Sequence, residues 1–303
     1  MKIMHVITRF ILGGAQENTL YTVEGQHALP EHEVMLVTGP AIGPEGELLK
    51  RAERSGVNTI VLTHLRRAIC PYHDSLAFLQ LCRLMSEFRP DVVHTHSSKA
   101  GVLGRLAARV CRVPVVVHTI HGLPFHPYQC ALLNWGYVLL ERWCARYTDK
   151  LITVADAMTR QALAARVGRP GLFRTIYSGL EVDTFLEEYD RAEVRDRYGL
   201  SREDLVVGKV ARLSDLKGHV FLFDAFEEVA RVEPRAKLLL IGDGWRRVEY
   251  ERRVRKGGLA GRVVFVGECG TCTWSASKRK VNAFADLLPE DVYPLYDQRL
   301  VHA

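Results

Sequence analysis

Two cations stand close together in the segment VARLSDLKG, where the residue pattern favours an anion-binding site. Arg212 follows a β-branched run that predicts a buried strand, and Lys217 lies just before a predicted helix. The end of the strand and the start of the helix would place both side chains at one edge of a sheet. A guanidinium binds phosphate oxygens through paired hydrogen bonds, and an ammonium acts as a point charge. We therefore expect Arg212 and Lys217 to bind a diphosphate. The plainer alternative is two solvated surface cations.

The glycine pair Gly13–Gly14 separates the first predicted strand from the first predicted helix. Two glycines allow a sharp turn and leave the N–H groups of the helix N-terminus open to an anion or a sugar hydroxyl. The spacing differs from G-x-G-x-x-G, so the dinucleotide fingerprint of nicotinamide-dependent oxidoreductases is absent. We expect a loop that contacts phosphate or acceptor. The alternative is a tight turn without a ligand.

Histidines follow the predicted fourth and fifth strands. His121, in the segment HTIHG, would lie at the carboxyl edge of the sheet, where open α/β sheets bind their ligands. Its imidazole could contact a sugar hydroxyl or stabilise developing charge, and the alternative is a histidine satisfied within its own loop. His94 and His96 form an H-x-H pair of a kind that ligates metals, but no carboxylate or cysteine stands at a matching spacing. We predict no metal site.

Seven cysteines are scattered along the chain, which is typical of a reducing compartment where thiols serve as small apolar side chains. Among them, Cys269 and Cys272 form a C-x-x-C pair. A zinc ribbon needs a second such pair, which the sequence lacks. We therefore treat the pair as incidental.

The elements that would position these residues alternate between short β-branched runs and helical stretches, which predicts an α/β fold with a parallel, doubly wound sheet. The first part of the chain contains predicted strands at Lys2–Thr8, Glu33–Thr38, Asn58–Leu62, Asp91–Thr95, Pro114–Thr119 and Lys150–Val154. The predicted helices between them are Ala15–Gln26, Gly46–Ser55, Leu76–Phe88, Lys99–Cys111 and Leu132–Ala145.

A second unit begins near Leu205, and the segment Gly168–Gly171 is a candidate hinge before it. Its predicted strands and helices are Leu205–Val210, Val220–Ala230, Lys237–Ile241, Trp245–Lys256 and Arg262–Val266. The alternation stops after Glu268, which leaves one half of a doubly wound domain. We expect four parts, namely an N-terminal Rossmann-like domain at 1–170, a linker region at 171–204, a partial C-terminal domain at 205–268, and an unrelated, poorly ordered tail at 269–303.

The composition of the 303 residues excludes several classes of protein. Hydrophobic residues make up 48% and charged residues 25%, with a mean hydropathy of −0.04, which rules out a wholly disordered or fibrous chain. The net charge of +6 is modest, so nucleic acid is not an expected partner. The N-terminus lacks the pattern of a signal peptide, and no run of about 18 apolar residues predicts a membrane span. We expect a cytoplasmic protein, with peripheral contact at the inner face of the membrane as a further expectation.

Two segments could touch a membrane surface. The predicted helix Leu132–Ala145 carries large apolar residues near one face, and Trp245–Lys256 is strongly basic. We expect instead that the first packs against the first sheet and that the second is a solvated helix face.

In their order and spacing, these segments resemble family 4 of the glycosyltransferases, retaining enzymes with the GT-B fold of two Rossmann-like domains. The similarity covers roughly Met1–Glu268. FILGGAQENTL resembles the glycine loop of the family, and DVVHTHSSKAGVLGRLAAR and VVHTIHGLPFH resemble its fourth- and fifth-strand segments. YSGLEVDTF is similar to its interdomain stretch, with Ser178 where asparagine is usual, and GKVARLSDLKGHVFLFDAF resembles its diphosphate-binding segment.

The resemblance implies a function and a role for each candidate residue. A sugar would pass with retention from a nucleotide-diphosphate donor to a glycan or lipid-linked acceptor, in cell-surface polysaccharide synthesis and without a metal or other cofactor. Arg212 and Lys217 would hold the donor diphosphate and neutralise the leaving group. Gly13 and Gly14 would approach the donor phosphate or the acceptor. His121 would contact the transferred sugar as the catalytic residue.

One motif of the family is missing from this sequence. The family carries Glu-x7-Glu late in the second domain, where the carboxylates contact the donor sugar and the ribose. After Glu268 the remaining glutamate is Glu290, and Gln298 stands eight positions further on. We expect a truncated copy with an unrelated tail and little or no transferase activity. The alternatives are an inactive remnant or binding module, and a GT-B-like nucleotide-sugar epimerase.

Overall fold

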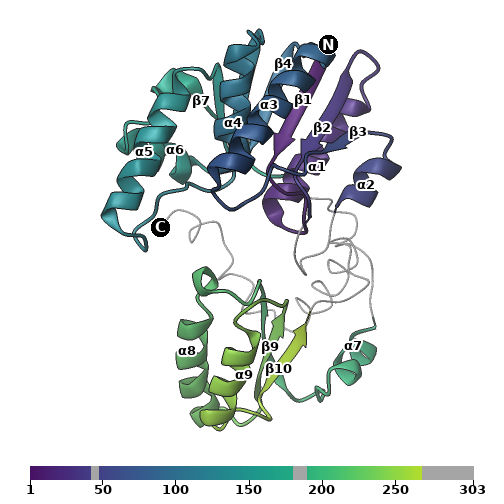
Figure 1. The fold of residues 1–303 in the computed structure, drawn as a ribbon. Coiled ribbons are helices and arrows are strands. Elements are labelled where there is room, and N and C mark those ends of the chain that lie inside the picture. The colour runs from purple at the N-terminus through teal and green to yellow at the C-terminus, as the bar shows by residue number, and fades with distance from the viewer. Residues whose placement is uncertain (42–47, 180–189, 268–303) are drawn as a thin grey trace. The chain divides into compact units, whose positions relative to one another are not determined.

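The computed structural model describes residues 1–41, 48–179 and 190–267 (Figure 1). The chain divides into two compact units, Met1–Gly179 and Leu180–Ala303. The stretch 269–303, with its C-x-x-C pair and with Glu290 and Gln298, lies outside the described residues.

The first unit is built on a seven-stranded parallel sheet with the order β3-β2-β1-β4-β5-β6-β7. The chain moves outward from β1 to β3 and then returns to the other side of β1 at β4. The strand order therefore reverses between β1 and β4, where open α/β sheets bind ligands. The strands are β1 Lys2–Ile7, β2 Glu33–Thr38, β3 Asn58–Val61, β4 Val92–His96, β5 Val115–Ile120, β6 Lys150–Thr153 and β7 Phe173–Thr175.

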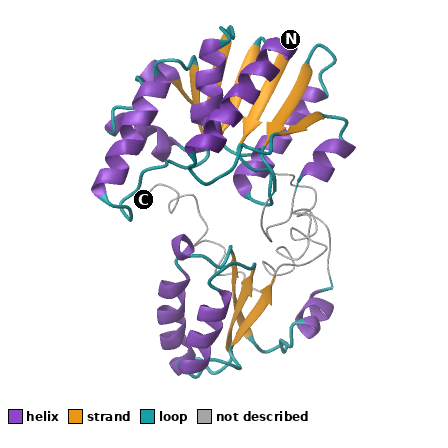
Figure 2. Cartoon of the chain, in the orientation of Figure 1, coloured by secondary structure: helices purple, strands orange, loops and turns teal. Residues whose placement is uncertain are grey.

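Helices cover both faces of this sheet, which explains why its strands lack polar alternation (Figure 2). Met4 and Val6 of β1 pack against α3 and α4 on one face. Ile3 and Ile7 pack against α1 and α2 on the other. The helices are α1 Gly14–His27, α2 Leu49–Arg54, α3 Pro71–Phe88, α4 Ser98–Val110, α5 Ala131–Ala145 and α6 Asp156–Ala164, and a 3-10 turn spans Pro170–Leu172.

The strands and helices predicted for this unit are confirmed, with ends that differ by a few residues. The largest difference is at α3, which begins at Pro71 rather than Leu76, because proline is favourable in the first turn of a helix. The sequence analysis missed α6 and the short strand β7. Because β7 pairs with β6, the first unit runs to Gly179. The expected boundary at residue 170 and the hinge at Gly168–Gly171 therefore fall inside this unit.

The second unit contains a three-stranded parallel sheet with the order β10-β9-β8 in the described part of the chain. Its core gathers Phe223, Phe226 and Tyr250 around the apolar side chains of β9. Val207 and Val210 of β8 are 39% and 46% exposed, so the described residues leave part of this strand uncovered. The elements are α7 Arg191–Arg197, β8 Leu205–Val210, the 3-10 turn η3 Asp215–Lys217, α8 His219–Val232, β9 Ala236–Ile241, α9 Arg247–Lys256 and β10 Val263–Gly267.

The apolar face of α5 overturns one expectation. Leu132, Trp135, Leu139 and Trp143 are 38–77% exposed and are not packed against the sheet. The helix buries its other side, near its C-terminal end. Helical periodicity identifies an apolar face but does not say which layer covers it.

Candidate functional site

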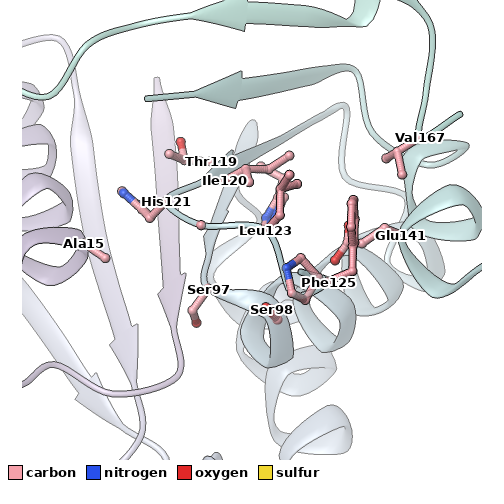
Figure 3. A pocket seen from close by; sticks show the side chains of 13 residues that line it. Ala15, Ser97, Ser98, Thr119, Ile120, His121, Leu123, Phe125, Glu141 and Val167 are labelled. Atoms are coloured by element: carbon pink, nitrogen blue, oxygen red, sulfur yellow. The ribbon is translucent and has the colours of Figure 1, made fainter. Parts of the chain in front are cut away.

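A pocket of about 250 Å³ lies at the carboxyl edge of the first sheet. It is lined by the end of β5 and the loop after it, by the first residues of α1 and α4, and by Glu141 of α5. Figure 3 shows His121 reaching from the end of β5 toward the side where Ala15 lies in the first turn of α1. Two helix N-termini therefore border one cavity, and each carries backbone N–H groups and a partial positive charge. Such a pocket suits an anionic or hydroxyl-rich ligand.

The predicted glycine pair lies at the start of α1, beside the pocket. Gly13 is the N-cap of the helix and Gly14 is its first residue. A Cβ on Gly13 would lie 2.9 Å from Oε1 of Gln16, whereas one on Gly14 would meet nothing within 4 Å. Ala15 lines the pocket and the two glycines do not. The turn therefore adjoins the pocket without forming its wall.

The start of α4 holds a strained residue at the pocket. Ser97 has φ 62° and ψ 157°, a conformation that is essentially restricted to glycine. Its Oγ lies 2.8 Å from Oγ1 of Thr8, which in turn accepts the N–H of Ala100 at 3.0 Å. These bonds tie the end of β1 to the first turn of α4. Strain of this kind concentrates at functional sites, and the sequence analysis did not single out Ser97.

Two glycines allow α4 to lie close to the sheet beside the pocket. A Cβ on Gly101 would lie 2.5 Å from the ring of His118, and one on Gly104 would lie 2.6 Å from Cγ2 of Thr95. His118 is held in place through Nδ1, which is hydrogen-bonded to Oγ1 of Thr95 at 2.9 Å. The small residues therefore place the start of α4 against the carboxyl ends of β4 and β5.

His121 lies where the sequence predicted, directly after β5, and it lines the pocket. Burial lowers its pKa to about 4, so the imidazole is neutral at pH 7. Its Nε2 lies 3.2 Å from Nδ1 of His96. Nδ1 of His121 makes no hydrogen bond to any residue that the structure describes, which leaves it available to a ligand. A neutral imidazole can donate from one nitrogen and accept at the other.

A cluster of buried histidines lies behind His121. His5 of β1 stands opposite His94 of β4, and His96 follows two positions along on the same face. Nitrogen atoms of these three rings lie within 4.8 Å of one another, and burial lowers the pKa of each. Neutral imidazoles this close could ligate a metal. The sequence analysis missed His5, because the pairing of β1 with β4 leaves no local signal.

A buried ion pair stands beside the pocket. Arg105 of α4 is fully buried, and its Nη2 lies 2.9 Å from Oε2 of Glu141, which lines the pocket. Its Nε donates to the carbonyl of Gly101 at 2.8 Å. Nη1 is buried and has no partner among the described residues. Burial and the charge of Arg105 both lower the pKa of His118.

In the second unit, Arg212 and Lys217 lie in the loop that follows β8, at the carboxyl edge of the sheet as predicted. Arg212 is partly buried and Lys217 is exposed. One detail differs from the prediction, because Lys217 ends the turn η3 and Gly218 caps α8. Gly218 has φ 65°, a left-handed conformation that favours glycine. The structure therefore brings both cations into one loop at the N-terminus of a helix.

Two features that the sequence analysis missed support this loop. Lys209 of β8 donates from Nζ to the carbonyl of Lys217, and burial and the charge of Lys217 lower its pKa. We call the loop after β8 that carries Arg212 and Lys217 the cation loop. A Cβ on Gly242 or Gly244, after β9, would clash with backbone oxygens of this loop. The two loops are therefore packed backbone against backbone. The segment IGDGW, with two glycines directly after a predicted strand, was the available signal.

The basic segment is α9 with the two residues before it, and three of its five arginines are ion-paired within the second unit. This pairing neutralises much of the basic charge, as expected for a solvated helix face. The pairs are Arg246 with Asp215 and Glu249, Arg247 with Asp243 and Glu251, and Arg253 with Asp224.

Two family models match the chain in sequence order. The glycosyl transferase 4-like domain matches residues 13–179, which is more than half of the chain. The chain belongs to the family 4 glycosyltransferases. A second model, glycosyl transferases group 1, matches residues 190–279. Its match ends at residue 279 and so overlaps the first part of the stretch at 269–303, which we expected to be an unrelated tail.

Curated relatives of this glycosyltransferase are similar over most of its length. The chain is 28% identical, over 80% of its residues and 62% of the relative, to a UDP-Gal:alpha-D-GlcNAc-diphosphoundecaprenol alpha-1,3-galactosyltransferase of Escherichia coli. It is 29% identical, over 68% of its residues and 55% of the relative, to the putative glycosyltransferase EpsD of Bacillus subtilis. The chain therefore spans less than two thirds of these relatives.

Solved structures confirm the fold class. HepE of Anabaena, in complex with UDP and glucose, matches with a TM-score of 0.74 at 21% identity, over 93% of this chain and 72% of that one. A sucrose-phosphate synthase from Thermosynechococcus elongatus matches with a TM-score of 0.68 at 18% identity, over 95% and 74% of the two chains. The fold is GT-B, with a large parallel sheet and a smaller second sheet. Within the described residues, no helix combines the length and apolar character needed to cross a membrane.

Proposed function

We propose that this glycosyltransferase moves a sugar from a nucleotide-diphosphate donor to a glycan or lipid-linked acceptor, with retention, in the synthesis of a cell-surface polysaccharide. The observation that carries the proposal is the loop after β8, where Arg212, Lys217 and the N-terminus of α8 stand together. The names of two relatives support it. The Escherichia coli relative is named for UDP-Gal, and a GDP-mannose-dependent alpha-(1-6)-phosphatidylinositol monomannoside mannosyltransferase of Mycolicibacterium smegmatis is 27% identical over 77% of this chain and 59% of the relative.

In this proposal, Arg212 and Lys217 bind the donor diphosphate and act as the glycosidic bond breaks. Negative charge then grows on the departing phosphate oxygen, and two preorganised cations stabilise it. Arg212 supplies a bidentate contact and Lys217 a point charge, with the dipole of α8 adding to both. Lys209 holds the carbonyl of Lys217 and so fixes the end of the turn.

The first unit would supply the contacts to the transferred sugar and the acceptor. His121 contacts the sugar, and its neutral ring does not repel the positive charge that develops at the anomeric carbon. Gly13 and Gly14, beside the pocket, approach the donor phosphate or the acceptor through N–H groups at the start of α1.

The proposed acceptor is a lipid-linked sugar, which would be met at the inner face of the membrane. The exposed apolar face of α5, Leu132, Trp135, Leu139 and Trp143, has the aromatic and aliphatic character of an interfacial helix. The net charge of +6 suits an anionic lipid surface. The Escherichia coli relative is named for a diphosphoundecaprenol-linked acceptor.

Nucleotide release by the full chain tests the proposal. UDP- and GDP-sugars are supplied with and without a lipid-diphosphate-linked sugar, and we expect slow release that occurs only with the acceptor. His121→Ala should lower kcat about 10²–10⁴-fold, the scale of a lost general acid–base or charge-stabilising group. His32→Ala is the matched control, since His32 precedes β2 at the opposite edge of the sheet.

Two other outcomes would contradict the transfer reaction and point elsewhere. Conversion of the supplied nucleotide sugar into its epimer, with the nucleotide still attached and without any acceptor, would favour a nucleotide-sugar epimerase. A putative UDP-N-acetylglucosamine 2-epimerase from Listeria monocytogenes is a neighbour of this chain in fold, with a TM-score of 0.60. Nucleotide binding without release would favour a binding module.

A further inference from the structure

Four polar side chains form one hydrogen-bonded line across the face of the first sheet that α1 covers, and the proposed function uses only the last of them. The line begins at Gln26 of α1, whose Oε1 lies 2.7 Å from Nε2 of His5. Nδ1 of His5 lies 3.1 Å from Nε2 of His96. Nδ1 of His96 lies 3.2 Å from Nε2 of His121, at the pocket.

The placement of the rings favours hydrogen bonds over a shared metal ion. The ring centroids of His5 and His96 are 5.4 Å apart. This distance is close to the separation of the two paired nitrogens plus the distance from each nitrogen to the centre of its own ring. The same holds for His96 and His121, again 5.4 Å apart. The paired nitrogens therefore point at each other along the line that joins the rings. Such a pair can share one proton, but its lone pairs do not converge on a third point.

The amide oxygen of Gln26 sets the direction of every bond in the line. A carbonyl oxygen can only accept, so His5 carries its proton on Nε2 and offers a lone pair at Nδ1. His96 must then donate from Nε2 and accept at Nδ1, and His121 must donate from Nε2. Because a neutral imidazole carries one N–H, Nδ1 of His121 is left as a bare acceptor.

The rings must be neutral for this order to hold, since a charged imidazole has protons on both nitrogens. Burial lowers the pKa of His5 and of His121 to about 4, and that of His96 well below its usual value. All three rings are therefore neutral at pH 7.

We propose that Gln26, His5 and His96 are positioning residues that fix His121 in its Nε2–H tautomer and present its unprotonated Nδ1 to a hydroxyl of the bound sugar. The identity of that ligand rests on the proposed function, whereas the tautomer does not. His94 stands outside the line, because its Nε2 is hydrogen-bonded to Oγ1 of Thr119 at 2.7 Å.

NMR of the full chain with ¹⁵N-labelled histidine tests the proposal, because long-range couplings to the ring nitrogens identify the one that carries the proton. We expect His121 in its Nε2–H form at pH 7. Gln26→Met removes the terminal acceptor and should leave His121 as a mixture of tautomers. His94→Phe, which alters a neighbouring ring, should leave the Nε2–H form unchanged.

An Nδ1–H tautomer in the unsubstituted chain, or an unaltered tautomer in Gln26→Met, would overturn the proposal. So would a stoichiometric metal ion bound by the purified chain and lost on His5→Gln. These readouts need no nucleotide sugar, so they stand whether or not the chain transfers a sugar.

A second pair of variants covers the case in which Gln26→Met does not fold. The side chain of His96→Gln can still donate to one neighbour and accept from the other, whereas that of His96→Leu can do neither. If the chain transfers a sugar, His96→Leu should lower kcat about tenfold, the scale seen when the outer partner of a functional histidine is lost. His96→Gln should restore most of the rate and the Nε2–H form. Equal effects of His96→Leu and His96→Gln would contradict the proposed line of hydrogen bonds.

Discussion

Buried imidazoles give the pocket of the first unit a chemistry that depends on pH. His5 and His96 are buried in the layer between the first sheet and α1, whereas His118 is buried in the layer between the sheet and α4, and each is hydrogen-bonded there. An unpaired charge in such a layer is costly, so the rings stay neutral. The residues that equip the site for a ligand therefore also make the fold sensitive to acid.

We predict that the free energy of unfolding falls as the pH is lowered from about 6.5 to about 4. An unfolded histidine has a pKa near 6.5, whereas burial lowers that of His5 and His121 to about 4. In this window the unfolded chain takes up protons that the folded chain excludes, so stability present above pH 6.5 is lost. Each such histidine contributes at most about 1.4 kcal/mol per pH unit. Urea unfolding at pH 7, 6 and 5 measures the slope. The free energy of unfolding of the His5→Gln chain should decline less steeply with falling pH than that of the unsubstituted chain. An equally steep decline in the two chains would contradict this account.

The ion pair of Arg105 and Glu141 is predicted to be sensitive to loss of either partner. Glu141→Gln leaves a buried guanidinium without its countercharge, which should cost about 3–5 kcal/mol of unfolding free energy. The double variant Arg105→Met/Glu141→Leu removes both charges and should recover much of that loss. Urea unfolding at pH 7.5 compares them. A double variant that is less stable than Glu141→Gln would contradict the explanation.

At the scale of elements, the approach of α4 to the sheet depends on missing side chains. We predict that Gly101→Ala lowers the stability, because its Cβ would lie 2.5 Å from the buried ring of His118. Overpacking of this kind costs about 1–3 kcal/mol, more than the gain of about 1 kcal/mol in helix propensity. Gly136→Ala in α5 is the matched control, since nothing lies within 4 Å of that position. It should raise the stability. Thermal unfolding measures both, and a Gly101→Ala chain as stable as the unsubstituted one would contradict the packing argument.

The exposed face of α5 is predicted to carry membrane contact. Trp135→Glu should greatly reduce co-sedimentation of the chain with vesicles that contain anionic phosphatidylglycerol. The substitution replaces an indole ring that is 62% exposed with a carboxylate, which loses the apolar contact and is repelled by the anionic lipid. Val232→Glu is the control, an apolar residue 83% exposed at the end of α8. Equal losses in the two variants would show a non-specific charge effect and contradict the assignment of α5.

The sequence predicted those elements whose burial leaves a local pattern. Strands covered on both faces read as β-branched runs, so six of the seven strands of the first sheet were found, and the three-residue β7 was too short to show one. Gly13, His121 and Arg212 could be singled out as candidates because glycines and polar residues at strand ends are local signals. His5 and Gln26 were missed, since their roles depend on strand pairing and helix placement across the fold.

At the scale of the whole molecule, each unit presents polar residues at the carboxyl edge of its own parallel sheet. In the first unit these are His121 and the starts of α1 and α4, and in the second they are Arg212 and Lys217. This arrangement follows from parallel βα units, which place every strand end and helix start at one edge. The central claim concerns the second unit, where we propose that the loop carrying Arg212 and Lys217 binds a nucleoside diphosphate.

Isothermal titration of UDP and GDP into the full chain tests that claim most directly. We predict that at least one of them binds, and that Arg212→Ala and Lys217→Ala each weaken binding by roughly 10–100-fold, since a charged hydrogen bond contributes about 1.5–3 kcal/mol. Lys256→Ala, at the far end of α9, should bind as the unsubstituted chain does. The claim would be contradicted if neither nucleotide bound. It would also be contradicted if the Arg212→Ala and Lys217→Ala chains bound as tightly as the unsubstituted chain.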